Sequence, residues 1–186
     1  MATRRARFGQ SALATPANAI TLGRLAAAPL LLVVVLASPS SWWTFALWMV
    51  LAGTDGFDGY VARRHGTTTS GAFLDPLADK CLVLAAMVAL VAKGVFWWFP
   101  VAVISAREAV ISGYRSVVAR RGISVPARAG AKVKTVIQDL AVGIALLPPA
   151  KGHYWIAEGL LWGATALTVV TGIQYLSDGR RLPRAV

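Results

Sequence analysis

The chain has 186 residues, enough for one domain or two small ones. Hydrophobic residues make up 56% of it and charged residues 15%, and the mean hydropathy is +0.60, which excludes a disordered tail, a coiled coil and an ordinary soluble enzyme. The net charge of +11 would suggest nucleic-acid binding in a soluble domain, and the single cysteine excludes an intramolecular disulfide or a cysteine-based metal site.

Six apolar stretches are long enough to cross a bilayer as helices. In chain order they cover residues 19–38, 42–63, 71–92, 97–119, 130–149 and 154–176. The connections between them contain proline, glycine, serine or charge, which is typical of turns. The sequence therefore predicts an all-α integral membrane protein of six transmembrane helices. An N-terminal segment (1–18) precedes the six-helix domain (19–177), and a basic tail (178–186) follows it.

The N-terminal segment admits more than one interpretation. Residues 3–17 fit a short basic helix on the membrane surface, with Phe8 and Leu13 facing inward, and they fit a frayed terminus equally well. A signal peptide, with residues 4–7 as its basic part and 29–37 as its apolar part, is disfavoured because Arg24 interrupts the apolar run.

The basic residues are distributed unequally between the two sides of the predicted bundle. Thirteen lie on the side of the termini, and the opposite loops hold only Lys93 and Lys151. The positive-inside rule therefore places both termini in the cytoplasm, in a multi-pass protein of the cell membrane. Topology and attraction to anionic lipid account for the net charge, and nucleic acid is not an expected partner.

The acidic residues concentrate in the second and third predicted spans. Asp55, Asp58, Gly59 and Ala62 follow one another at i, i+3, i+4 and i+7, which places them on one helical face. A carboxylate inside a membrane is costly and indicates a functional site. The alternative is that these aspartates cap helices or line a pore without catalysis.

The third span repeats this arrangement. Gly71, Asp75 and Asp79 stand at i, i+4 and i+8, and the short connection predicts that spans two and three are antiparallel and adjacent. Four carboxylates that close together require a cation, and their oxygen ligands favour one or two Mg²⁺ or Mn²⁺ ions. A cation transporter would also use such a site, but no inverted repeat or broken helix is visible.

This acidic pattern resembles the signature of the CDP-alcohol phosphotransferases, membrane enzymes that make phospholipid head groups: Asp55-x2-Asp58-Gly59-x2-Ala62-Arg63-x7-Gly71-x3-Asp75-x3-Asp79. Family members usually have eight or more residues where this chain has the seven between Arg63 and Gly71. Three further stretches resemble members that use sn-glycerol 3-phosphate as acceptor: Gly71-Ala-Phe-Leu-Asp75-Pro76-x2-Asp79-Lys80, Ala106-Arg107-Glu108 and Gly130-x-Lys132-x-Lys134-Thr135.

The resemblance implies an activity and its partners. The protein would transfer the phosphatidyl group of CDP-diacylglycerol to glycerol 3-phosphate and release CMP, commonly as a homodimer of six-helix chains. Inositol phosphate, serine and phosphatidylglycerol are the alternative acceptors within the family. Asn18-x2-Thr21-x2-Arg24 is similar to the family's N-terminal element.

The resemblance also implies roles for individual residues. The metal ligands would be Asp55, Asp58, Asp75 and Asp79, with Asp79 also the general base. The residues expected to bind CDP-diacylglycerol are Asn18, Thr21, Gly59, Ala62, Arg63, Thr68 and Gly71. The residues expected to bind the acceptor phosphate are Arg107, Arg115, Lys132 and Lys134. Two structural alternatives stay open: Lys132 as a lipid anchor at the surface, and Arg107 paired with Glu108 or Asp139.

Overall fold

A computed structural model describes the backbone of residues 16–65, 69–120 and 129–179 and the side chains of residues 21–54, 77–114 and 133–174. Over these residues the chain is all-helical, as predicted. The elements are α1 (Pro16–Ala37), α2 (Trp42–His65), α3 (Thr69–Ala92), α4 (Trp98–Arg120), α5 (Ala129–Leu146), the short 3-10 helix η1 (Pro148–Ala150) and α6 (Trp155–Gly179). Each of the six long helices overlaps one of the predicted spans.

The helix boundaries follow from local residue chemistry. α1 begins at Pro16, three residues before the predicted start, and proline suits a first helical position because its missing N–H has no intrahelical partner there. Gly94 after α3 and Gly152 before α6 adopt positive φ angles of 69° and 81°, which favour glycine. The segment considered as a surface helix lies outside the described residues, apart from its last two positions, which belong to α1.

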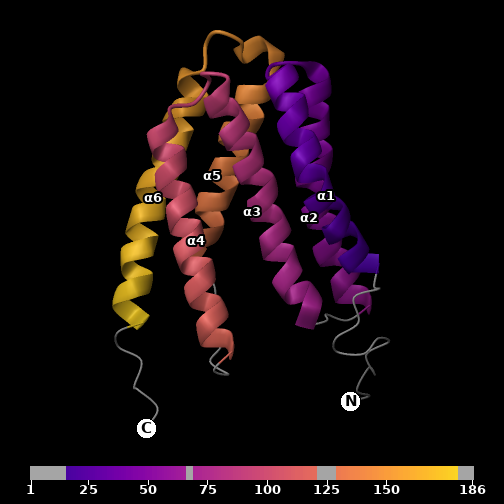
Figure 1. Cartoon of the computed structure of the whole chain (residues 1–186), viewed down its shortest axis with the longest axis vertical. Helices are drawn as coiled ribbons and strands as arrows, with labels where there is room; N and C mark the ends of the chain where they lie inside the picture. The colour runs from indigo at the N-terminus through magenta and orange to yellow at the C-terminus, as the bar shows by residue number, and fades with distance from the viewer. Residues whose placement is uncertain (1–15, 66–68, 121–128, 180–186) are drawn as a thin grey trace.

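Successive helices run in opposite directions along a single bundle (Figure 1). α1 begins and α6 ends at the same end of this bundle, where α2 and α4 also end and α3 and α5 begin. We call this end the terminal end of the bundle. The arrangement is consistent with the even number of spans that the charge distribution predicts.

One continuous face of α1 explains how the first half of the chain packs. Buried residues on α1 recur at intervals of three and four, which is the spacing of one helical stripe: Thr21, Arg24, Ala28, Leu31 and Val35. α1 packs against both α3 and α2, and α5 also contacts both of these helices. Over the described residues, direct packing of α2 on α3 is minor, and the expected adjacency of the two helices next to their connection stays a prediction.

The interior of the bundle changes character along its length. Far from the terminal end, all six helices contribute buried apolar side chains, among them Leu31, Trp48, Met87, Ile104, Val142 and Leu161. From the middle of the bundle toward the terminal end, polar or charged side chains are also buried, namely Thr21, Arg24, Glu108, Lys134, Gln138, Thr165 and Thr168. The fold therefore encloses a polar region on one side of a tightly packed apolar core.

Large apolar side chains cover the outside of the bundle, among them Val33 on α1, Met49 on α2, Val88 on α3, Val110 on α4, Val136 on α5 and Ile173 on α6. In the described part of the chain, one helical segment is long and apolar enough to span a membrane, Trp155–Gln174. Thr21–Ala37 and Trp42–Thr54, which are the parts of α1 and α2 with described side chains, are apolar but shorter. Charged residues such as Lys80 and Arg107 interrupt the apolar sequence of α3 and α4.

Candidate active site

The predicted acidic site falls on two helices of the bundle. α2 carries Asp55 and Asp58, and α3 carries Asp75 and Asp79. The side chains of the first three lie outside the described residues, so the structure describes only the carboxylate of Asp79. Among the described side chains, no group of three or more acidic, histidine or cysteine residues is placed to hold a metal ion. The carboxylate-only donor set fits a hard divalent cation, and the metal site stays a prediction.

Asp79 is held by a buried arginine of α1. Its Oδ1 accepts a hydrogen bond from Nη1 of Arg24, whose side chain is 2% exposed, whereas the Asp79 side chain is 33% exposed. Arg24 lies one turn beyond Thr21 on the buried stripe of α1, so this stripe faces the predicted base. Sequence reasoning gave Arg24 no role of its own. The sequence feature that could have indicated a role is a charged residue inside a predicted span, three positions after Thr21 and on the same helical face.

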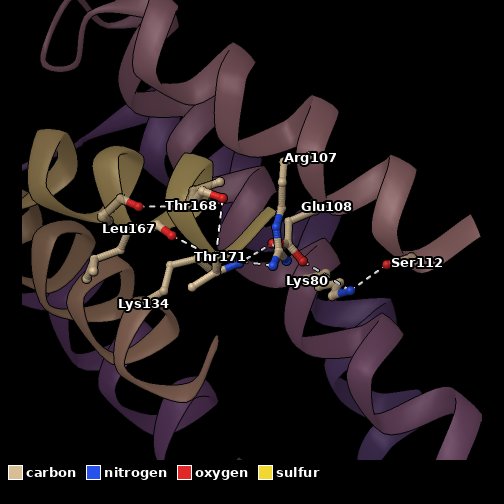
Figure 2. A network of polar contacts seen from close by, with 9 residues as sticks. Lys80, Arg107, Glu108, Ser112, Lys134, Leu167, Thr168 and Thr171 are labelled. Atoms are coloured by element: carbon tan, nitrogen blue, oxygen red, sulfur yellow. Dashed lines mark hydrogen bonds and ion pairs between the residues drawn. The ribbon is translucent and has the colours of Figure 1, made fainter. Parts of the chain in front are cut away.

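A second polar group is centred on Glu108 of α4 (Figure 2). Oε1 of Glu108 accepts hydrogen bonds from Nη1 of Arg107, at 3.0 Å, and from Nζ of Lys134. Oε2 lies 3.1 Å from Nζ of Lys80, which also donates to Oγ of Ser112. We call Lys80, Arg107, Glu108 and Lys134 the Glu108 cluster.

The Glu108 cluster contains residues of three helices and contacts a fourth. Lys80 comes from α3, Arg107 and Glu108 from α4, and Lys134 from α5, while Nη2 of Arg107 donates to Oγ1 of Thr171 on α6 at 3.3 Å. The Lys134 and Glu108 side chains are 3% and 9% exposed. At that burial an unpaired charge would be strongly destabilising, so the contact between Glu108 and Lys134 is needed to keep both charges inside the bundle.

The structure brings together two of the four residues predicted to bind the acceptor phosphate. Arg107 and Lys134 both contact Glu108, so the alternative that Arg107 pairs with Glu108 is confirmed as a contact. The side chains of Arg115 and Lys132 lie outside the described residues. Sequence reasoning assigned no role to Lys80 and considered Glu108 only as a partner of Arg107. Both are charged residues inside predicted spans, which by itself suggests a function. That Glu108 contacts both Lys80 and Lys134 depends on how α3, α4 and α5 pack.

For most of the residues expected to bind CDP-diacylglycerol, the structure gives only the helix on which each residue lies. Thr21 is buried on α1, in line with Arg24. The side chains of the other members lie outside the described residues: Asn18 on α1, Gly59, Ala62 and Arg63 on α2, and Gly71 on α3. Thr68 falls in the connection between α2 and α3, which is also outside them. Their role stays a prediction.

The two polar groups meet at consecutive residues of α3. Successive residues of an α-helix point about 100° apart, because one turn takes 3.6 residues. Asp79 can therefore face α1 and contact Arg24, while Lys80 faces α4 and contacts Glu108. The arrangement places a carboxylate able to accept a proton next to a buried group rich in positive charge. Such a pair suits the transfer of a phosphoryl group between an alcohol and an anionic substrate.

A sequence model of the CDP-alcohol phosphatidyltransferases matches residues 14–170, so the chain belongs to this family and is a transferase.

Curated relatives cover nearly the whole chain. A protein of Mycobacterium tuberculosis (strain ATCC 25618 / H37Rv), named probable phosphatidylglycerophosphate synthase, is 35% identical over 93% of this chain and 85% of the relative. CDP-diacylglycerol–glycerol-3-phosphate 3-phosphatidyltransferase of Rickettsia bellii (strain RML369-C) is 40% identical over 85% of this chain and 91% of the relative. The protein of the same name from Bacillus subtilis (strain 168) is 37% identical over 86% of this chain and 92% of the relative.

Proposed function

We propose that this protein transfers the phosphatidyl group of CDP-diacylglycerol to sn-glycerol 3-phosphate, giving phosphatidylglycerophosphate and CMP. The names of the relatives support both substrates. The single structural observation that carries the proposal is the Glu108 cluster, a buried group of three cations and one carboxylate beside Asp79. A phosphorylated acceptor supplies the negative charge that this group lacks.

In the proposed reaction, a hydroxyl oxygen of glycerol 3-phosphate attacks the β-phosphorus of CDP-diacylglycerol. The bond from that phosphorus to the bridging oxygen of the diphosphate breaks, and CMP leaves. Asp79 accepts the proton of the attacking hydroxyl, and Arg24 orients the Asp79 carboxylate. Arg107 and Lys134 bind the acceptor phosphate, and Arg63 binds the diphosphate.

The four aspartates of α2 and α3 would hold one or two divalent ions, Mg²⁺ or Mn²⁺. Such an ion supplies positive charge that stabilises the diphosphate and the departing CMP. This assignment rests on the aspartate pattern and on the family. Asn18, Thr21, Gly59, Ala62, Thr68 and Gly71 are proposed to line the nucleotide pocket.

We further propose that all six helices cross the membrane, with both termini and the active site on the cytoplasmic side, and that the protein forms a homodimer. The apolar exterior combined with buried Arg24, Glu108 and Lys134 supports the membrane assignment, because a soluble domain normally shows the opposite pattern. A membrane site with a cytoplasmic opening suits one lipid substrate and two water-soluble species.

The test is CMP release by the purified full chain in lipid vesicles containing CDP-diacylglycerol, with Mg²⁺ or Mn²⁺ and one acceptor at a time. We expect release with glycerol 3-phosphate and little with inositol phosphate, serine or phosphatidylglycerol. Release with another of these acceptors alone would refute the proposed substrate and leave the family unchanged. The alternative of a cation transporter fails if CMP release depends on an acceptor at all.

A further inference from the structure

The Glu108 cluster contains more positive charge than its structural role requires. Lys80, Arg107 and Lys134 all contact one carboxylate, which leaves two positive charges uncompensated among these side chains. Arg107 and Lys134 are only 14% and 3% exposed, and they share a single carboxylate, although surplus charge at such burial is costly. A phosphate monoester carries up to two negative charges at neutral pH, which would balance the cluster.

We propose that Glu108 is a positioning residue that holds Lys80, Arg107 and Lys134 in place for the acceptor phosphate, and that Lys80 is a further phosphate-binding residue. This inference rests on the proposed function and deepens it.

Arg107 shows how Glu108 positions the cluster. Its Nη1 donates to Glu108 and its Nη2 donates to Thr171, whose hydroxyl in turn donates to the carbonyl oxygen of Leu167 at 2.7 Å. The guanidinium is therefore fixed from two sides. Its Nε is buried, yet it has no hydrogen-bond partner among the described residues. A buried donor without a partner is unfavourable, and an oxygen of a bound phosphate would satisfy it.

Lys80 connects this phosphate position to the reacting hydroxyl. It follows Asp79 directly in α3, so the two Cα atoms are about 3.8 Å apart. Glycerol 3-phosphate is short, and its phosphate and free hydroxyl must contact groups that lie close together. A phosphate bound between Lys80 and Arg107 would leave the hydroxyl within reach of Asp79. Lys80 is 29% exposed, so it is more accessible than Lys134.

The test uses the full chain in lipid vesicles and two variants, Glu108→Gln and Lys80→Met. Lys93→Met is the matched control, because Lys93 is an exposed lysine just after the opposite end of α3. The first readout is the KM for each substrate, with the other substrate saturating. The second is the rise in Tm caused by glycerol 3-phosphate in detergent, with glycerol as the ligand control that lacks phosphate.

We expect Glu108→Gln and Lys80→Met each to raise the KM for glycerol 3-phosphate about tenfold or more, the effect of one lost charge-assisted contact. The KM for CDP-diacylglycerol should stay within about twofold, and the Tm rise caused by glycerol 3-phosphate should disappear. Lys93→Met should match the wild type in both readouts. Glu108→Asp, which keeps the charge on a shorter side chain, should restore part of the affinity.

Tighter binding of glycerol 3-phosphate by Glu108→Gln would overturn the inference, because Glu108 would then compete with the phosphate for the cations. Equal increases in both KM values would overturn it as well, since they indicate a general loss of structure. If Glu108→Gln does not fold, Lys80→Met decides, and a normal KM for glycerol 3-phosphate in that variant refutes the phosphate contact. The wild type could use inositol phosphate in place of glycerol 3-phosphate. If both variants then raise the KM for inositol phosphate, the proposed acceptor is refuted and the roles of Glu108 and Lys80 are retained.

Discussion

A glycine on α6 offers a way to move Arg107 without removing any charge. A Cβ atom at Gly172 would lie 3.5 Å from Cγ of Arg107 and 3.8 Å from its Nε, which are ordinary contact distances. Gly172→Ala should therefore be tolerated. A methyl carbon bonded to that Cβ extends about 1.5 Å further, so we expect valine to crowd the Arg107 side chain and displace it. A Cβ atom at Gly163 on the same helix would have nothing within 4 Å, and Gly163→Val is the matched control.

The expected size of the effect follows from the contacts that Arg107 would lose. Displacement breaks its hydrogen bonds to Glu108 and Thr171 and removes the guanidinium from the proposed phosphate position. A hydrogen bond to a charged group contributes about 1.5–3 kcal/mol. At about 1.4 kcal/mol for each factor of ten, Gly172→Val should raise the KM for glycerol 3-phosphate roughly ten- to one-hundredfold. The assay is CMP release at varied glycerol 3-phosphate and saturating CDP-diacylglycerol.

Three comparisons decide the outcome. Gly172→Ala and Gly163→Val should both retain a near-normal KM for glycerol 3-phosphate, and Gly172→Val should retain its KM for CDP-diacylglycerol. If Gly172→Val keeps a normal KM for glycerol 3-phosphate, Arg107 does not bind the acceptor in the position described. If it raises both KM values equally, the substitution disturbs helix packing and says nothing specific about the acceptor site.

Three further predictions concern the metal site, the topology and the core. Asp55→Asn should abolish both CMP release and the metal-dependent binding of CDP-diacylglycerol. Asp79→Asn should abolish CMP release but keep the binding of CDP-diacylglycerol. If the two variants bind CDP-diacylglycerol equally, Asp79 does not have a separate role as the base. In a cysteine-free background, a cysteine at Ser40 should react with an impermeant reagent added outside the cell, and one at Thr68 only after permeabilisation; outside labelling at Thr68 would place the site on the wrong face. Trp48→Ala should destabilise the fold by about 3–5 kcal/mol, seen as a lower Tm, because this side chain is 2% exposed in the core; an unchanged Tm would argue against its packing.

The number and approximate limits of the helices were predictable because they depend on local sequence. Apolar length gives each helix, and turn residues such as Gly94 and Gly152 separate them. The start of α1 at Pro16 differs from the prediction because the residues from Pro16 to Asn18 add little hydropathy to the first span.

The site was predictable only in part. Spacing alone placed Asp75 and Asp79 on one face of a helix, because helical phase is a local property. The contact of Arg24 with Asp79 and the meeting of Lys80 with Glu108 join residues 55 and 28 positions apart. Such pairs depend on which helices pack together, and the packing of α1 on α3 was not expected. Chemical type therefore identified the charged residues, while only the fold identified their partners.

The central claim is that the phosphatidyl group moves as a unit to glycerol 3-phosphate. It is tested most directly by incubating the full chain in vesicles with CDP-diacylglycerol labelled at the β-phosphorus with radioactive phosphorus and with unlabelled glycerol 3-phosphate. We predict that all transferred label appears in the phosphodiester of a lipid that also contains the added glycerol phosphate, with one unlabelled CMP released per lipid. Label in a nucleotide product, in phosphatidic acid or in a lipid without glycerol phosphate would contradict the account.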